Sequence, residues 1–326
     1  MRVVHTLVAL ALLSINASAS ASPRQVEHAY GITEINVAPK RVVSLSYIGH
    51  DFLLALGVKP IALRHWYGPH DFGVWPWAQE ALGDAEPTVI YGGIDIDQIA
   101  LLEPDLIVGQ WSGMTKAEYA LLSQIAPTLA HPKDESPYSA SWQQMTRQLG
   151  RALDRDTEAK RIVDDLETRF ADIRAAHPEW QNATAVAAYA PRLSAYGASD
   201  LRGRFLKDLG FSLPSELAKI ARFDANFIRL EQENIGTLDT DVLIWVHAPS
   251  INAALDDIVL RPTLKAYRDG REVYTDFDLT SALNHSSPLS LNYALDTLIP
   301  LLDAAFDGDP NTLVPGWTSD KKVSSQ

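Results

Sequence analysis

The chain of 326 residues contains no cysteine. This absence excludes disulfides, thiolate metal sites, cysteine nucleophiles and lipid anchors attached through a thioether. Basic residues are also few, because 28 lysines and arginines stand against 41 aspartates and glutamates, a formal net charge of −13. Nucleic acids and anionic membranes are therefore poor partners, since the protein offers them no long-range attraction.

Long apolar runs are missing as well. The apolar stretch at residues 7–15 is far shorter than the roughly 20 residues that span a bilayer, and no later segment is continuously apolar over such a length. Arg2 precedes this stretch, and small-residue sites at 17–21 follow it, which is the arrangement of a secretory signal peptide. We predict that residues 1–21 are a signal peptide and that the mature protein is exported and soluble.

Strand-like and helix-like segments alternate along the rest of the chain. Apolar runs of strand length occur at residues 41–46, 60–63, 105–108, 184–190, 241–246 and 272–274. Helical patterns lie between several of them, and this alternation predicts an α/β fold with mainly parallel sheets. The near-continuous apolar character of the runs is typical of strands that are covered on both faces.

Two pairs of similar segments indicate that this architecture occurs twice. Residues 96–108 align with residues 232–244, which pairs Asp105 with Asp241. A second pair, FLLALGV and FLKDLGF, occurs in the same order. We therefore predict two similar α/β lobes in tandem.

A long amphipathic helix is expected between the lobes. Ile162, Leu166, Phe170 and Ile173 are spaced by four, four and three residues, which places them on one helical face. A helix over residues 157–176 would be about 30 Å long and would make a stiff connector that permits only small closing motions. We predict an N-terminal lobe, a connecting helix, a C-terminal lobe and a flexible tail at residues 39–150, 151–178, 179–306 and 307–326.

No recognised catalytic or nucleotide-binding motif is present. Gly-Xaa-Ser-Xaa-Gly, Gly-Xaa-Gly-Xaa-Xaa-Gly, a Walker-type loop and His-Glu-Xaa-Xaa-His are all absent. Of the nine histidines only His65 and His70 lie close together, which is not a metal-ligand spacing. The sequence thus favours a protein that is not an enzyme and has no metal site of its own.

Aromatic and arginine side chains gather where the predicted strands end, and ligand crevices of open α/β sheets lie at such ends. The candidate ligand-binding residues of the first lobe are Tyr47, Arg64, Trp66, Tyr67 and Trp111. Those of the second lobe are Arg192, Tyr196, Arg204, Phe223 and His285. Arginines clustered in an acidic chain suggest a planar anionic ligand. Simple packing is the alternative reading, which we prefer for Trp75 and Trp77, and Arg202 is expected to pair with a nearby aspartate.

The motifs RVVSLSYIGHDFLLALGVKPIAL, DIDQIALLEPDLIVGQWSG, LEQENIGTLDTDVLIWV and LKAYRDGREVYTDFDLTSAL occur in this order over residues 39–306. In order and spacing the chain resembles the periplasmic iron-siderophore binding proteins of ABC importers. The resemblance implies two α/β lobes joined by one long helix and a shallow cleft that holds an Fe(III)-siderophore complex. It also implies little movement on binding, no catalysis, no intrinsic cofactor and a monomer.

The resemblance further implies a membrane permease as partner, docked by one acidic residue of each lobe. Glu118 matches that position in the first lobe, whereas the second lobe offers Asp256 in place of the family's glutamate. Where hydroxamate-binding relatives carry an arginine, this chain has Tyr91. Lipoprotein relatives carry a cysteine after the signal peptide, so its absence predicts a free periplasmic protein with no lipid anchor.

A siderophore receptor needs no protein ligands on the metal, because the chelator fills the coordination shell of iron. Aromatic faces and arginines are then used to recognise the outer surface of the complex. Three alternatives stay open: a receptor for haem or a corrinoid, a receptor that binds a metal ion directly through His65 or His247, and a secreted α/β hydrolase. Hydroxamate, catecholate and carboxylate siderophores are not distinguished by these residue types.

Overall fold

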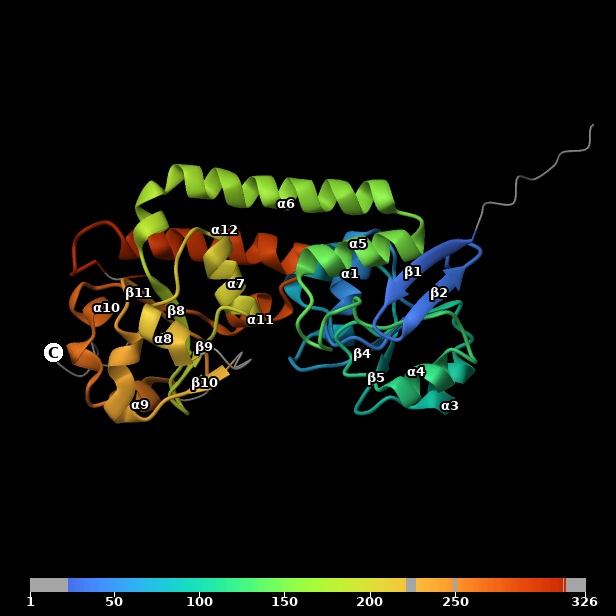
Figure 1. Cartoon of the computed structure of the whole chain (residues 1–326), viewed down its shortest axis with the longest axis horizontal. Coiled ribbons are helices and arrows are strands. Elements are labelled where there is room, and N and C mark those ends of the chain that lie inside the picture. Colours follow the sequence, from blue (N-terminus) through green and yellow to red (C-terminus); the bar gives the residue numbers. More distant parts are fainter. Residues whose placement is uncertain (1–22, 221–226, 249–250, 313, 315–326) are drawn as a thin grey trace, which may run out of the picture.

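The computed structural model describes residues 23–220, 227–248, 251–312 and 314. The predicted signal peptide, Phe223 and most of the predicted tail lie outside these ranges. Two five-stranded sheets lie at opposite ends of an elongated molecule (Figure 1), each surrounded by helices. The predicted α/β fold with two similar lobes and mainly parallel sheets is confirmed.

The sheet of the N-terminal lobe is entirely parallel and has the order β5-β4-β3-β6-β7. Its strands are β3 (Val42–Ser44), β4 (Ala62–Arg64), β5 (Thr88–Ile90), β6 (Leu106–Val108) and β7 (Thr128–Leu129). The three central strands are buried along their length, as their continuous apolar runs require. Helices α1 (Gly49–Ala55), α2 (Pro76–Leu82), α3 (Ile96–Leu101), α4 (Lys116–Leu122) and α5 (Trp142–Leu153) complete the lobe.

The sheet of the C-terminal lobe has the corresponding order β10-β9-β8-β11-β12. Its strands are β8 (Ala185–Tyr189), β9 (Ser194–Tyr196), β10 (Phe227–Arg229), β11 (Val242–Trp245) and β12 (Glu272–Tyr274). Strand β9 is antiparallel to both of its neighbours, because a short turn replaces the helical crossover found in the first lobe. The helices of this lobe are α7 (Leu201–Asp208), α8 (Ser215–Ile220), α9 (Ile251–Asp256), α10 (Lys265–Arg268), α11 (Phe277–His285) and α12 (Pro288–Ala305).

The two aspartates paired in the sequence occupy equivalent places in the two sheets. Asp105 accepts a hydrogen bond of 2.7 Å from the backbone N–H of Arg41, the residue before β3. Asp241 accepts one of 2.8 Å from the backbone N–H of Thr184, the residue before β8. The segments of the second similar pair do not occupy equivalent places. FLLALGV lies between the first two strands of its sheet, whereas FLKDLGF lies between the second and third strands of its sheet.

Helix α6 (Asp156–Ala176) joins the lobes along one side of the molecule. Its buried side chains are Ala159, Val163, Leu166 and Phe170. Helix α12 lies beside α6 and packs against α1 and α2 of the first lobe as well as β12 of the second. The apolar spacing of residues 157–176 predicts α6, whereas no sequence pattern indicates this second bridging role of α12.

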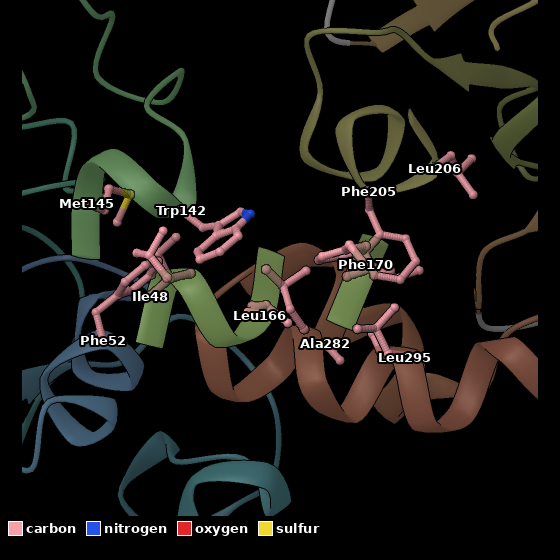
Figure 2. Close-up of a cluster of buried hydrophobic side chains, with 14 of the residues drawn as sticks. Ile48, Phe52, Trp142, Met145, Leu166, Phe170, Phe205, Leu206, Ala282 and Leu295 are labelled. Atoms are coloured by element: carbon pink, nitrogen blue, oxygen red, sulfur yellow. The ribbon is translucent and has the colours of Figure 1, made fainter. Parts of the chain in front are cut away.

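One hydrophobic core runs through the junction of the lobes. Figure 2 shows Phe52 and Trp142 of the first lobe, Phe170 of α6, and Phe205 and Leu295 of the second lobe within the same buried cluster. A hairpin of β1 (Arg24–His28) and β2 (Gly31–Ile35) adds to this core and was not predicted. None of the helices in the described ranges combines the length and apolar character needed to cross a bilayer.

Candidate functional site

Aromatic side chains from both lobes meet at the junction, and we call this set the aromatic surface. Its members in the first lobe are Tyr47, Trp66, Tyr67, Trp111 and Tyr138, and those in the second are Tyr196, Phe227, His247 and Phe277. Tyr196 and Phe227 contact each other and are linked to the other members through Arg202 and Asn284. Trp66, Tyr138, Phe227 and Phe277 have exposed fractions between 38% and 45%. Exposed large apolar side chains gathered in one place are typical of a binding surface.

Three neighbouring parallel strands position the first-lobe part of the aromatic surface. Tyr47 follows β3, Trp66 and Tyr67 follow β4, and Trp111 follows β6, so all four lie at the carboxyl edge of the sheet. The ring centroids of Tyr47 and Trp66 are 5.9 Å apart, and those of Trp66 and Tyr67 are 4.7 Å apart. The backbone N–H of Tyr47 donates to the carbonyl of Trp111 over 3.4 Å. The structure thus brings these four predicted residues together at the edge of the sheet where ligands bind in such folds.

Tyr138 extends the surface and was not identified from the sequence. Its ring meets Trp111 edge-on with centroids 5.4 Å apart. Gly113 has a φ of +69°, and a Cβ atom there would lie 2.1 Å from the Tyr138 hydroxyl, so the glycine makes room for the ring. Burial raises the pKa of the Tyr138 phenol, which keeps the hydroxyl protonated as a hydrogen-bond donor.

Phe277 and His247 continue the surface into the second lobe. Phe277 begins α11 directly after β12, and His247 follows β11. The centroids of these two rings are 5.5 Å apart, and the centroid of Tyr67 lies 6.2 Å from that of Phe277. From the sequence, His247 was considered only as a direct metal ligand and Phe277 was not singled out, although their place after strand ends would have been enough to include both.

A hydrogen-bonded chain links Tyr67 to the C-terminal lobe. The side-chain amide of Asn284 donates to the Tyr67 hydroxyl over 3.0 Å, and Arg202 donates to the amide oxygen of Asn284. Arg202 also donates to both carboxylate oxygens of Asp200, at 2.7 and 2.6 Å, and its guanidinium lies 3.8 Å from the centroid of the Tyr196 ring. The expected pairing of Arg202 with an aspartate is confirmed, and Arg202 is an arginine of the second lobe that contacts the aromatic surface.

Arg64 lies beneath the aromatic surface. Its exposed fraction is 7%, and it donates to the carbonyls of Gly92 and Ser112 at 2.8 and 3.1 Å. Its guanidinium lies 4.2 Å from the centroid of the Tyr47 ring. Arg64 therefore holds two loops and one aromatic ring in place.

His285 is placed differently from the expectation of a residue that faces the cleft. Its exposed fraction is 1%, and its ring lies behind Trp66 with centroids 5.4 Å apart. Burial among aromatic rings lowers its pKa to about 4, so the imidazole is neutral near pH 7. Trp75 is 1% exposed and stacks on Trp77, which confirms the packing role predicted for this pair.

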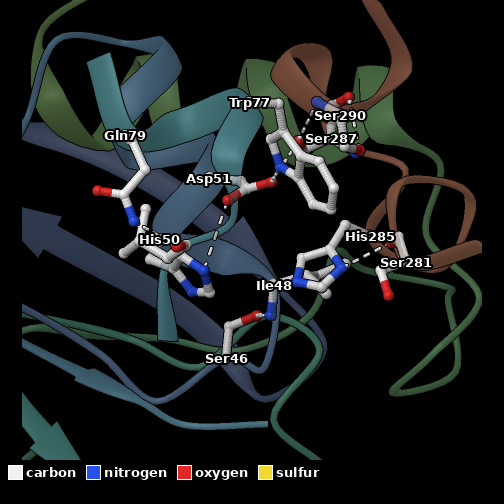
Figure 3. A network of polar contacts seen from close by, with 11 residues as sticks. Ser46, Ile48, His50, Asp51, Trp77, Gln79, Ser281, His285, Ser287 and Ser290 are labelled. Carbon is white, nitrogen blue, oxygen red and sulfur yellow. Dashed lines mark hydrogen bonds and ion pairs between the residues drawn. The ribbon is translucent and has the colours of Figure 1, made fainter. Parts of the chain in front are cut away.

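A buried polar network lies beside His285 (Figure 3). Asp51 of α1 accepts hydrogen bonds from the indole N–H of Trp77 at 2.7 Å and from the Ser287 hydroxyl at 2.8 Å. Ser287 is the N-cap of α12, so this carboxylate ties the first lobe to the start of the second bridging helix. Burial lowers the pKa of the neighbouring His50.

Besides the buried Arg64 and His285, three further predicted site residues are not on the aromatic surface of the described structure. Arg204 lines a separate cavity of about 680 Å³ at the back of the junction, because α7 turns it away from Arg202. Arg192 is exposed in the turn between β8 and β9. Phe223 lies outside the described residues.

The two predicted docking acids lie at the outer ends of the lobes. Glu118 is the N3 residue of α4 and accepts from the backbone N–H and the hydroxyl of Thr115, both at 2.7 Å, through the same carboxylate oxygen. Asp256 is exposed at the end of α9. Figure 1 shows α4 and α9 on the side of the molecule away from α6.

The chemistry of the site is that of recognition by contact. Over the described ranges, no group of three or more histidines, aspartates or glutamates is arranged to hold a metal ion. The surface instead offers flat aromatic faces and phenol hydroxyls, with a buried arginine close behind. Such a surface suits a large, rigid ligand that carries its own acceptor oxygens.

The family model described as "Periplasmic binding protein" matches residues 42–279. A curated relative, the probable siderophore-binding lipoprotein YfiY of Bacillus subtilis, is 29% identical over 77% of this chain and 79% of its own length. Among solved structures, a periplasmic solute binding protein of Mycobacterium smegmatis has a TM-score of 0.74 and 31% identity, over 85% of this chain and 96% of the other. Streptococcus pneumoniae PiaA in complex with ferrichrome has a TM-score of 0.73 and 25% identity, over 88% of this chain and 99% of the other.

One prediction from the sequence is corrected by these comparisons. We expected a free periplasmic protein with no lipid anchor, but the Bacillus subtilis relative is named a lipoprotein. We based that expectation on the absence of a cysteine, but a relative with 29% identity over 77% of this chain is named a lipoprotein, so a free protein is not implied. A role outside the cytoplasm fits the comparisons.

Proposed function

Because this chain belongs to the periplasmic binding protein family, we propose that it binds a ferric siderophore on the aromatic surface and delivers it to the permease of an ABC importer. Two relatives support this choice of ligand, one named a siderophore-binding lipoprotein and one crystallised with ferrichrome. The relatives named here are binding proteins, which supports a protein that captures its ligand without converting it.

The observation that carries the proposal is the meeting of both lobes in one aromatic surface. Trp66 and Tyr67 from the first lobe and Phe277 from the second form a continuous set of ring contacts. A ferric siderophore is bulky and presents oxygen atoms and apolar groups on its outside, because its donor atoms are occupied by iron. Aromatic faces contact the apolar parts, and phenol hydroxyls donate to the oxygens.

Delivery requires a surface that the permease contacts while the ligand is bound. We propose that Glu118 and Asp256 serve as docking acids, one on each lobe. Their helices lie on the side away from α6 (Figure 1), and the second carboxylate oxygen of Glu118 is not used by the helix cap. Paired acids at the outer ends of two rigid lobes would set the distance between two basic sites on the partner.

A tryptophan-fluorescence titration tests the choice of ligand. The purified protein is titrated with ferric hydroxamate, catecholate and carboxylate siderophores, with the iron-free chelators, haem, cobalamin and zinc as comparisons. We expect saturable quenching by one ferric complex and none by its iron-free chelator. A response to haem, cobalamin or zinc alone would retain the family and reject the siderophore.

A pair of variants tests the place of binding. Trp66→Ala removes an exposed ring at the centre of the aromatic surface, and we expect the dissociation constant to rise by about tenfold or more. Tyr267→Ala is the matched control, because Tyr267 is an aromatic residue of similar exposure on α10. Equal affinities of the two variants would exclude the aromatic surface as the binding site.

A further inference from the structure

We propose that the cavity at the back of the lobe junction is a second binding site, which takes small amphipathic anions such as aromatic carboxylates. The cavity has a volume of about 680 Å³ and is lined by residues of α5, α6, α7 and the start of α12. Sites for small molecules typically have volumes of roughly 300 to 1,000 Å³. Nothing in the proposed siderophore function uses this cavity.

The floor of the cavity is apolar and contains one unsatisfied donor. Trp142, Phe205 and Leu291 line it and are buried. The indole N–H of Trp142 is buried and has no hydrogen-bond partner among the described residues. Figure 2 shows the indole nitrogen on the edge of the ring that is turned toward Phe205. Because an unpaired buried donor is unfavourable, a ligand that supplies an acceptor atom here is stabilised.

The mouth of the cavity carries an excess of positive charge. Arg147, Arg204 and Lys207 line it together with only two acids, Glu167 and Asp208. Arg147 lies 4.0 Å from Glu167, whereas the side chains of Arg204 and Lys207 have no hydrogen-bond or ion-pair partner in the described part of the chain. Burial raises the pKa of the Asp208 carboxyl, whereas the positive charges of Arg174, Lys207 and Arg204 oppose this shift. In a chain with a net charge of −13, this is a local site for an anion.

The cavity is separate from the aromatic surface. The turn between α11 and α12 divides them, since Ser286 lines the cavity while His285, the preceding residue, contacts Trp66. Ser286 is the C-cap of α11 and adopts a left-handed φ of +43° at this turn. A ligand in the cavity would thus contact both lobes without occupying the aromatic surface.

Isothermal titration calorimetry with 2-naphthoate as the probe tests the proposal, and the neutral 2-naphthamide serves as the comparison. We expect one saturable site for the carboxylate and at least tenfold weaker binding of the amide, because charge-assisted hydrogen bonds are lost. Arg204→Gln should weaken binding of the carboxylate by about tenfold. Trp142→Phe should weaken it by several-fold, because it removes the N–H and keeps an aromatic ring.

Two variants serve as controls for charge and location. Arg151→Gln removes an arginine from α5 that does not line the cavity, and Trp66→Ala alters the aromatic surface, so both should bind 2-naphthoate as the unmodified protein does. Absence of saturable binding, equal binding of the amide, or equal affinities of Arg204→Gln and Arg151→Gln would each overturn the proposal. Loss of binding in Trp66→Ala would place the probe on the aromatic surface and also overturn it. Siderophore binding by the same variants is measured in a separate titration. Failure of the second-site proposal therefore does not decide whether the aromatic surface binds a siderophore.

Discussion

Replacing His285 by phenylalanine should make the protein's stability less sensitive to acid. The imidazole is enclosed by Trp66, Trp75 and Trp77, with ring centroids 5.3 to 5.7 Å away. Burial lowers its pKa from 6.5 to about 4, with Asp51 opposing the shift and His50 adding to it. In the unfolded chain the same histidine titrates near 6.5. Between these two values the unfolded state binds a proton that the folded state does not, so stability is lost as the pH falls.

The size of the effect follows from these two pKa values. Between pH 7.5 and pH 5, one histidine that shifts from 6.5 to about 4 lowers the free energy of unfolding by about 2 kcal/mol. Burial also lowers the pKa of His28, to about 4, so the unmodified protein should lose more than this single contribution. The difference between the unmodified protein and His285→Phe isolates the contribution of one residue.

Urea unfolding followed by tryptophan fluorescence at pH 7.5, 6 and 5 measures this difference. We expect the loss of unfolding free energy on acidification to be about 2 kcal/mol smaller in His285→Phe, with an unchanged dependence on urea concentration. Parallel pH profiles of the two proteins would refute the argument, because they would mean that His285 binds a proton equally in both states. His28→Phe offers an independent test of the same reasoning at a site in the β1–β2 hairpin.

Three further substitutions test other contacts. Asp51→Ala should lower the free energy of unfolding by about 3 kcal/mol, because two buried donors lose their acceptor. Urea denaturation measures this free energy. A loss below about 1 kcal/mol would mean that water replaces the carboxylate. Asn284→Ala should cost about 1 kcal/mol in the same assay, since Arg202 keeps its aspartate; an unchanged protein would mean that the link between the lobes contributes nothing. Glu118→Gln keeps the cap with Thr115, so the melting temperature should stay unchanged. The same change should reduce siderophore-dependent uptake of iron in cells. Normal uptake would exclude the docking role.

The sequence predicted the parts of the fold that have long or continuous apolar patterns. Helix α6 was located within one residue at its start, because its apolar positions recur over 21 residues and Pro178 ends it. Strands β5, β7 and β9 were not predicted, because their sequences TVI, TL and SAY lack a continuous apolar run such as LIV in β6 or VLIW in β11. The exact lobe boundaries remain a prediction, and the hairpin before residue 39 packs into the shared core.

The candidate site was predicted best where the end of a strand fixes the sheet edge at which a side chain lies. Tyr47, Trp66, Tyr67 and Trp111 follow strands of one sheet, so their common edge was predictable from topology. The directions of the arginine side chains on α7 were harder to predict. Residues two positions apart on a helix point about 200° apart, because a helix has 3.6 residues per turn. Arg202 and Arg204 therefore cannot face the same surface, and the choice between them depends on the phase of the helix, which the Asp200 cap sets.

The contacts across the junction imply that the aromatic surface exists before a ligand arrives. Two helices bridge the lobes, the shared core runs between them, and Asp51 and Tyr67 each bond a residue of the other half. Opening the lobes widely would expose that core and leave the buried carboxylate of Asp51 without its partner on α12, which is costly. We therefore expect closure to be limited to small adjustments, with little ordering cost subtracted from the binding energy. Affinity in such a receptor depends on how well the rings fit the ligand, and for that reason the exposed Trp66, and not a hinge, is the residue whose loss should weaken binding most.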